Sequence, residues 1–264
     1  MNKHTIVIAG IFINLFFCFT LFSQEDEFQQ LKNENWKPVF EDDFRSGLRS
    51  DWVLDGRKGK LLCTPEGMEF YAGKRAFQDE DHAVLWLRKH FSGDIKIEYD
   101  YTRLDSSLVE SVNIIYLHAS GNGQGDYVPD IFEWNELREI PAMKVYFNHM
   151  NAYHISYAVT GPDSLLRDYI RARRYMPDRK QGLKGTALLP EYLNTGLFKP
   201  GIKHHITVIL RKSRLYMEVQ TESETRLFWF DTESLPPLSE GYIGLRQMWT
   251  RAARYSDFKV SVPD

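Results

Sequence analysis

The residues best suited to acid–base chemistry lie together in residues 148–157. This segment contains two histidines, His149 and His154, and the tyrosines Tyr153 and Tyr157. Histidine exchanges protons near neutral pH, and a tyrosine can do so where nearby cations lower its pKa. Alternate side chains of a strand point to opposite faces, so both histidines line one cleft only if a turn or bulge separates them. Alternatively, the tyrosines pack within a sheet and one histidine is merely hydrogen-bonded.

A basic segment follows this cluster. Residues 167–184 contain seven cations and two aspartates, in a chain whose formal net charge is −3. The planar guanidinium of arginine pairs through two hydrogen bonds with a carboxylate or a sulfate. We therefore predict anion binding here, with Arg173 as a catalytic residue beside His149, His154 and Tyr157. The alternative is a solvated helix face.

Further candidates for substrate binding lie near strand ends. His118 ends an apolar strand and leads into a glycine-rich loop, residues 119–126, which suits the edge of a cleft. Near the C-terminus, Trp249 would stack on a sugar ring if exposed and would fill the core if buried, whereas Arg251 would hold an acidic substituent. The predicted substrate-binding residues are Asn113, His118, Arg174, Gln247, Trp249 and Arg251.

No motif in the sequence indicates a metal or a cofactor. His204 and His205 are adjacent on a strand and would point to opposite faces, and no Cys/His ligand spacing or aspartate-rich calcium loop is present. We therefore predict no metal and no cofactor. The negative net charge also argues against a nucleic-acid partner.

The elements that must position these residues are mostly strands. In residues 94–101 the odd positions are apolar and the even positions are charged, as in a half-buried strand. Residues 112–118 are more uniformly apolar, as in a central strand. Helix signals are scarce, and the best lies at residues 164–175, between two prolines. Many short strands separated by turns favour a sandwich or a barrel. Further strands are expected at residues 206–210, 215–220, 227–230, 242–248 and 255–262.

The N-terminus predicts export. Residues 1–23 combine a short polar start with a long apolar run and a small residue at the end, as in a cleaved signal peptide; the alternative is an uncleaved membrane anchor. We expect a polar arm at 24–35, either a short helix or loose, and then a domain at 36–264. The expected location is secreted or periplasmic, with no membrane partner after cleavage. Cys63, alone after cleavage, cannot form an intrachain disulfide.

The two ends of the chain carry a recognisable pattern, in residues 39–44 before Trp52 and in residues 241–246 before residues 253–260. This pattern resembles the concanavalin-A-like lectin/glucanase superfamily, in which the first and last strands pair in a curved jelly roll. Residues 148–157, with the arginines that follow, resemble a small bacterial family registered as domain of unknown function 1961. The resemblance implies an all-β, concanavalin-A-like jelly-roll β-sandwich with one short helix. It also implies a role in using polysaccharides that contain uronic acid and rhamnose.

One departure from the superfamily affects the expected chemistry. Its glucanases carry a Glu-x-Asp-x-x-Glu motif on one strand, and the spacing of Glu133, Glu136 and Glu139 does not match it. A retaining glycosidase needs two carboxyl groups roughly 5 Å apart. The absence of a marked pair therefore argues against ordinary glycoside hydrolysis.

Histidine, tyrosine and arginine without a carboxylate pair suit elimination beside a uronic acid carboxylate. A cation neutralises the carboxylate, a base removes the C5 proton, and an acid protonates the group that leaves C4. The sequence thus predicts an oligosaccharide dehydratase or a polysaccharide lyase that forms a 4,5-unsaturated uronyl end on an acidic oligo- or polysaccharide such as ulvan or rhamnogalacturonan. The alternatives are a non-catalytic carbohydrate-binding module and a glycoside hydrolase that uses unrecognised carboxylates.

Overall fold

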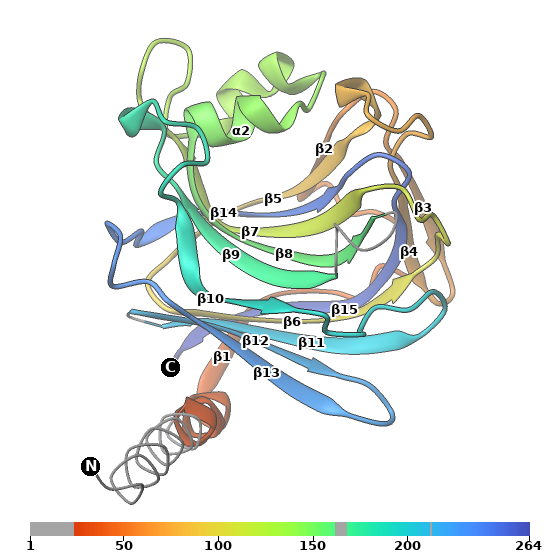
Figure 1. The fold of residues 1–264 in the computed structure, drawn as a ribbon, viewed down its shortest axis with the longest axis vertical. Helices are drawn as coiled ribbons and strands as arrows, with labels where there is room; N and C mark the ends of the chain where they lie inside the picture. The colour runs from red at the N-terminus through yellow and green to blue at the C-terminus, as the bar shows by residue number, and fades with distance from the viewer. Residues whose placement is uncertain (1–23, 162–167, 212) are drawn as a thin grey trace, which may run out of the picture.

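The computed structural model describes residues 24–161, 168–211 and 213–264, so the predicted signal peptide lies outside the described residues. Two antiparallel sheets pack face to face, which confirms the predicted β-sandwich (Figure 1). Sheet A contains, in spatial order, β13 (Thr225–Asp231), β12 (Arg214–Gln220), β11 (Lys203–Arg211), β6 (Ile95–Arg103), β15 (Ala252–Pro263), β4 (Gly67–Tyr71) and β3 (Lys60–Thr64), with β1 (Trp36–Asp42) also paired to β15. Sheet B contains β10 (Ala187–Leu193), β9 (Tyr169–Tyr175), β8 (Met150–Thr160), β7 (Ser111–Gly121), β14 (Glu240–Gln247), β5 (Ala83–Ser92) and β2 (Trp52–Asp55).

The first and last strands pair as the resemblance implied. β1 runs antiparallel to β15, with Phe40 opposite Val260. Both side chains are buried and belong to the core between the sheets. The first and last strands of the chain therefore belong to the same sheet.

Strand β6 shows how alternation builds the core. Ile95, Ile97 and Tyr99 are fully buried between the sheets, whereas Lys96 and Glu98 lie on the outer face, 3.6 Å apart. Burial of each isoleucine contributes roughly 2 kcal/mol. The strand predicted from the alternating residues 94–101 is thus confirmed.

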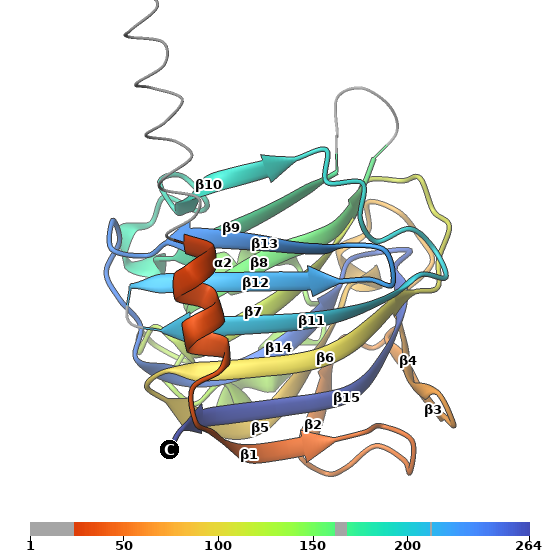
Figure 2. The ribbon, with the colours of Figure 1, turned by 90° about the horizontal axis from the view of Figure 1, so that it is seen from below.

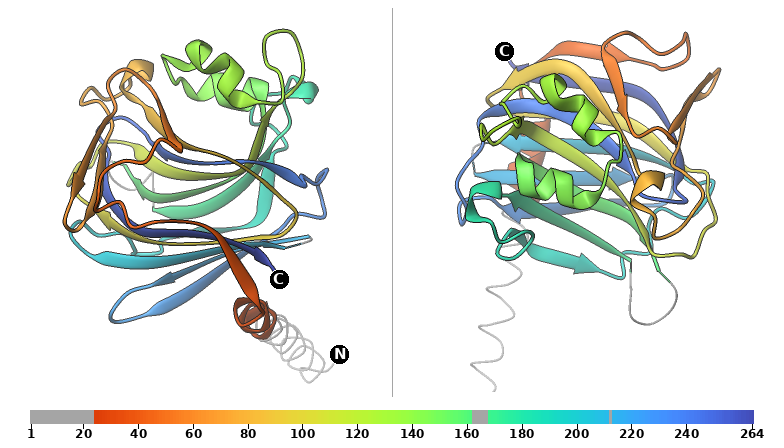
Figure 3. Two further views of the ribbon diagram at one scale, coloured as in Figure 1. Left: turned by 180° about the vertical axis from the view of Figure 1, so that it is seen from behind. Right: turned by 90° about the horizontal axis from the view of Figure 1, so that it is seen from above.

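A cap of short helices covers part of the concave face of sheet B (Figures 1 and 3). It consists of the 3₁₀ segment η2 (Ile131–Arg138) and helix α2 (Met143–His149). Beneath it, Trp86 stacks on Tyr116 with ring centroids 5.3 Å apart, and Tyr146 of α2 stacks on Tyr116 at 5.9 Å. A second apolar core therefore lies between the cap and the sheet.

A buried acid fixes the cap to the sheet. Asp55, at the end of β2, accepts hydrogen bonds from Arg138 Nε at 2.5 Å, Trp86 Nε1 at 2.7 Å and the Tyr146 hydroxyl at 3.0 Å. The side chains of Asp55 and Arg138 are at most 1% exposed. One carboxylate thus joins η2, α2 and strands β2 and β5.

Residues 24–32 form a helix, which decides between the two expectations for this segment. It crosses the outer face of sheet A (Figure 2). Phe28 and Leu31 pack there against Ile209 and Tyr216. No helix of the described residues is long and apolar enough to cross a membrane.

The helix expected at residues 164–175 is wrong where it can be examined. Residues 164–167 lie outside the described part of the chain, and residues 169–175 form strand β9. Ile170 and Ala172 face the core, whereas Arg171 and Arg173 face outward. Pairing with β8 determines this conformation, since Ala172 lies opposite Ile155.

Candidate functional site

Cross-strand pairing brings polar side chains together on the concave face of sheet B. Tyr116 of β7 lies opposite His154 of β8, which lies opposite Arg173 of β9. In the adjacent row, Ile114 of β7 lies between Arg246 of β14 and Ser156 of β8. Opposed residues of antiparallel strands point to one face. We call this group the concave cluster: Tyr116, His154, Ser156, Arg173, Tyr175 and Arg246.

Two hydroxyl groups hold the His154 ring. Its Nδ1 lies 2.7 Å from the Tyr175 hydroxyl and its Nε2 lies 3.2 Å from Ser156 Oγ. Burial, followed by the charges of nearby arginines, holds the pKa of His154 well below its usual value. The ring is therefore neutral at pH 7, with one nitrogen donating and the other accepting.

Tyr116 and Tyr175 continue this line of polar groups. The Tyr116 ring centroid lies 6.1 Å from those of both His154 and Tyr175. Burial raises the pKa of both phenols, and the charge of Arg246 opposes that shift in each. Both hydroxyls therefore stay protonated at neutral pH and are suited to passing a proton rather than holding a charge.

Arg246 is the buried cation of the cluster. Its side chain is fully buried, its Nη2 donates to Pro141 O at 2.5 Å and to His82 Nδ1, and its Cζ lies 4.7 Å from the Tyr146 ring centroid. Among the described residues, no hydrogen bond of normal geometry reaches Nε or Nη1, although the guanidinium lies close enough to the Tyr116 hydroxyl to oppose the rise that burial causes in its pKa. A buried donor left unpaired is costly. An anionic group brought against this guanidinium would remove that cost.

His82 and Trp249 form the end of the cluster near the β14–β15 connection. Burial and the charge of Arg246 lower the pKa of His82 to about 2, so this imidazole is neutral and accepts from Arg246. The Trp249 ring meets His82 edge to face at 4.5 Å, and its Nε1 donates to Glu110 O at 2.6 Å. Trp249 is half-buried. The Phe77 ring also packs against this indole, with ring centroids 5.4 Å apart, so only the remaining part of the Trp249 side chain is exposed.

The β9 side of the cluster is partly exposed, whereas the side beneath the cap is buried. Tyr169, Arg171 and Arg173 are partly exposed, whereas Ser156 is 6% exposed and His154 only 2%. Arg171 pairs with Glu191, whereas Arg173 donates to Thr186 Oγ1 at 3.1 Å. A ligand approaching from β9 would meet Arg173 and Ser156 before it reached His154.

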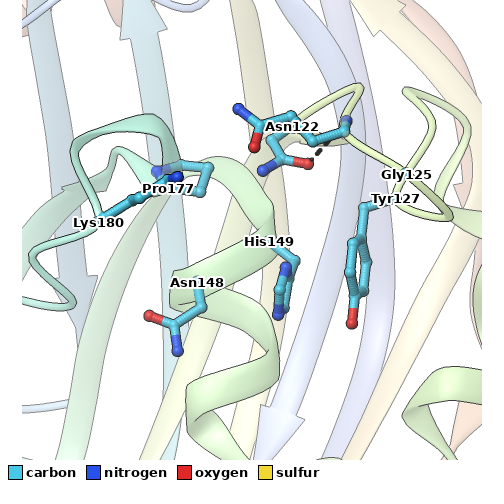
Figure 4. Close-up of a pocket in the computed structure, with 8 residues that line it drawn as sticks. Asn122, Gly125, Tyr127, Asn148, His149, Pro177 and Lys180 are labelled. Carbon is cyan, nitrogen blue, oxygen red and sulfur yellow. Dashed lines mark hydrogen bonds between the residues drawn. The ribbon is translucent and has the colours of Figure 1, made fainter.

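The structure separates His149 from His154. Helix α2 ends at His149, and β8 begins at the next residue. His149 lines a pocket of about 550 Å³, the edge pocket, between the loop around Asn122 and the turn at Pro177, and stacks on Tyr127 at 3.6 Å (Figure 4). Both histidines could line one cleft only if a turn separated them. A turn does separate them, but it places His149 in the edge pocket, away from His154.

Three predicted site residues lie between the sheets instead. The Asn113 side chain accepts from the Tyr101 hydroxyl at 3.1 Å and donates to Gln247 Oε1 at 2.6 Å. The Tyr157 hydroxyl lies 3.3 Å from that of Tyr255. All three are fully buried, so the assignment of Asn113 and Gln247 to substrate binding and of Tyr157 to catalysis is wrong for this conformation. They form a polar layer inside the sandwich.

Arg174 and Arg251 are also engaged within the protein. Arg174 donates to Pro236 O at 3.0 Å and to Asn151 Oδ1 at 3.2 Å, on the face opposite Arg173. Arg251 is 1% exposed and pairs with Asp105 at 2.9 Å. These contacts connect loops to strands. Neither guanidinium is free to bind a substrate, contrary to the prediction.

His118 has a similar structural setting. Its Nδ1 lies 3.4 Å from Leu238 O, and its side chain is 1% exposed. Burial lowers its pKa to about 4. Among the predicted site residues, the structure therefore brings only His154 and Arg173 together in the concave cluster, with Trp249 at its end.

Sequence reasoning missed Tyr116, Tyr175 and Arg246. Arg246 lies in the terminal pattern of residues 241–246, but this pattern alone does not indicate which face of the sheet it occupies. A Cβ at Gly244 would lie 2.5 Å from the Trp86 ring, so this position admits only glycine. Arg246 lies two residues later and therefore on the same face of β14. Tyr175 was assigned to a helix, which hid its alternation with Arg173.

No group of three or more metal-ligating side chains occurs in the described parts of the chain. The concave cluster contains nitrogen and hydroxyl donors and cations but no carboxylate. Such a set attracts anions and repels divalent cations. Glu133, Glu136 and Glu139 are solvent-exposed on the cap, away from this cluster.

The model of the family described as Domain of unknown function (DUF1961) matches residues 39–260. The chain belongs to this family. No curated protein sequence matches it significantly.

Solved structures share the fold at low identity. A Bacillus subtilis protein of unknown function with a galectin-like fold is 20% identical, with 86% of this chain and 98% of that one covered and a TM-score of 0.60. The VIP36 exoplasmic/lumenal domain in its Ca²⁺/Man3GlcNAc-bound form is 13% identical, with 86% and 90% covered and a TM-score of 0.55. Lectin II from Ulex europaeus is 8% identical, with 85% and 99% covered and a TM-score of 0.53. These similarities establish the lectin-like sandwich.

Proposed function

We propose that this protein binds an acidic glycan on the concave face of sheet B and eliminates across C4–C5 of a uronic acid. The observation that carries the proposal is a neutral, desolvated His154 hydrogen-bonded to Tyr175 among arginines. Lectin-like relatives of the fold support a carbohydrate ligand. The arginines favour an acidic one.

The chemistry uses the line of hydroxyls around His154. With the uronic carboxylate held by Arg173 and Arg246, the C5 proton becomes more acidic. His154 Nε2 takes that proton, the C5–H electron pair forms the C4=C5 double bond, and the C4–O bond breaks. The leaving oxygen takes the Ser156 hydroxyl proton, and His154 returns a proton to Ser156. The product is water from a free 4-hydroxyl or a sugar from a glycosidic bond.

The test is absorbance at the band of the unsaturated uronyl product. Purified protein is incubated with sulfated and unsulfated uronic-acid oligosaccharides, and reducing ends are counted in parallel. The wild type should produce absorbance, and His154→Gln and Ser156→Ala should lose about 100-fold or more of the rate, as for loss of a general acid–base group. His90→Gln removes an exposed histidine and serves as the matched control.

Each outcome of this assay has a defined meaning. A folded His154→Gln variant that eliminates at the wild-type rate would refute the assignment, and its thermal unfolding curve shows whether it is folded. New reducing ends without absorbance would mean hydrolysis. Ser156→Ala removes one hydroxyl and keeps the assay informative if the histidine variant does not fold.

The burial of the cluster favours a second candidate function, a non-catalytic carbohydrate-binding module. Arg246 and Tyr175 are fully buried and His154 is 2% exposed, so a sugar could bind along β9 through Arg171 and Arg173 without reaching the imidazole. Calorimetry with the same oligosaccharides separates the two functions. Binding without absorbance or new reducing ends would favour the module.

We further propose that the protein acts outside the cytoplasm after cleavage near residue 23. The polar start and apolar run of residues 1–23 support this proposal. Intact mass of protein isolated from a cell envelope extract and from the medium tests it. A mature chain that begins near residue 24 is expected, and a full-length chain in the cytosolic fraction would contradict it.

A further inference from the structure

A second pocket lies where the two sheets meet at one end of the sandwich. It has a volume of about 850 Å³, within the usual range for a ligand site. We call it the basic pocket. Its walls come from β3 and β4 of sheet A, the turn before β3, the loop before β5 and the β14–β15 connection. The lining residues are Arg57, Lys58, Lys60, Leu62, Tyr71, Ala72, Gly73, Lys74, Arg75, Asp81, Thr250, Arg251 and Ala252.

The lining is strongly cationic, with six cations against one carboxylate. Four of these cations pair with acidic residues: Lys58 and Arg75 with Asp81, Arg57 with Glu139, and Arg251 with Asp105. Lys60 and Lys74 are exposed, and their ammonium groups make no ion pair or hydrogen bond with any residue that the structure describes. These two ammonium groups are available to an anionic ligand.

The pocket also offers apolar surface for a sugar ring. Leu62 is 55% exposed, and Tyr71 is half-buried with its hydroxyl donating to Glu69 at 2.5 Å. An aromatic side chain with a fixed polar end presents its face to the flat side of a pyranose. Cations around one aromatic ring suit a saccharide that carries a carboxylate or a sulfate.

Asp81 organises the loop that carries Lys74 and Arg75. Its side chain is 3% exposed and accepts from the Arg75 backbone N–H at 3.1 Å and from Arg75 Nε at 3.0 Å. A Cβ at Gly73 would lie 2.2 Å from Asp81 Oδ1, so only glycine fits there. The loop is therefore fixed before any ligand arrives.

The basic pocket and the concave cluster share one boundary. Asp81 faces the pocket, whereas the next residue, His82, contacts Arg246. On the opposite side Thr250 lines the pocket and the preceding residue, Trp249, contacts His82. Figure 3 shows η1 (Asp79–Asp81) beside the cap at this boundary. His82 and Arg246 are buried at this boundary, so a chain of sugars that reaches both regions has to lie across the partly exposed Trp249.

We propose that the basic pocket binds a second anionic unit of the same glycan, so that the ligand is a polysaccharide with repeated carboxylate or sulfate groups. This inference rests on the proposed function for the identity of the ligand. It adds that affinity depends on chain length and on charges remote from His154.

Affinity gel electrophoresis with the full chain tests the proposal, with three polysaccharides as probes. Polygalacturonate carries only carboxylates, carrageenan only sulfates, and dextran neither. Lys60→Ala/Lys74→Ala should weaken binding to at least one anionic probe by about 3- to 30-fold at low salt, the range for losing two solvent-exposed charge contacts. Lys37→Ala/Lys199→Ala removes two exposed lysines outside the pocket and should bind like the wild type.

The outcomes separate this inference from the proposed function. If the pocket variant binds both anionic probes as the control variant does, the basic pocket is not a glycan site, whether or not elimination occurs. Equal binding of dextran would also overturn the inference. If the pocket variant loses affinity while no substrate gives absorbance, the pocket stands and the elimination proposal falls. The anionic probe that shows the loss identifies the preferred group.

Discussion

Replacing Asp55 with alanine should detach the cap from sheet B. The substitution removes the acceptor for Arg138, Trp86 and Tyr146 and leaves the Arg138 guanidinium buried without its counter-charge. Breaking a buried ion pair from one side costs about 3–5 kcal/mol. For a chain of this size, that loss lowers the melting temperature by about 10 °C.

Urea unfolding followed by tryptophan fluorescence measures this loss, because Trp86 lies at the junction. Asp51→Ala is the matched control, since its carboxylate pairs on the surface with Arg49 at 2.8 Å and should contribute less than about 1 kcal/mol. The reasoning is refuted if Asp55→Ala unfolds within 1 kcal/mol of the wild type. In that case, the apolar contacts beneath the cap would hold it without the acid.

Substitutions at Arg246, Asn113 and His118 test other parts of the structure. Arg246→Met should weaken binding of a uronic-acid oligosaccharide about tenfold or more in calorimetry, and unchanged affinity would exclude the buried guanidinium as an anion contact. Asn113→Ala should cost about 2 kcal/mol of unfolding free energy by breaking its contacts with Tyr101 and Gln247 while leaving the elimination rate unchanged. The pKa of His118 in the folded state is about 4, below its ordinary value of 6.5. His118 therefore contributes about 3 kcal/mol to the free energy of unfolding above pH 6.5, and this contribution is lost as the pH falls from 6.5 through 4. His118→Gln should therefore show a flatter dependence of unfolding free energy on pH than the wild type, and parallel curves would contradict this.

The architecture could be predicted because alternation and burial act locally. Residues 94–101 alternate so regularly that they indicate a strand without knowledge of its neighbours. The pairing of β1 with β15 followed from the resemblance carried by the two ends. In contrast, residues 169–175 also alternate, but the prolines at 162 and 177 favoured a helix. Pairing with β8 outweighed those local signals.

The site was harder to predict because it depends on register. His154 and Ser156 share the concave face, whereas Tyr153 and Tyr157 lie in the core, as alternation along one strand requires. Either face of β8 could have carried the polar cluster. The choice depends on Tyr116 and on the pairing of β8 with its neighbouring strands β7 and β9. The predicted catalytic residue His149 ends a short helix and therefore lies outside the concave cluster. No local sequence signal indicated that helix.

The most direct test of the central claim compares two single-hydroxyl deletions on opposite faces of sheet B. Tyr175→Phe removes the partner of His154 on the concave face, whereas Tyr157→Phe removes a hydroxyl inside the sandwich. Elimination rates on one uronic-acid oligosaccharide are measured for both variants by absorbance. We predict a loss of about 100-fold for Tyr175→Phe and less than twofold for Tyr157→Phe. Equal rates, or the larger loss in Tyr157→Phe, would contradict the placement of the chemistry on the concave face.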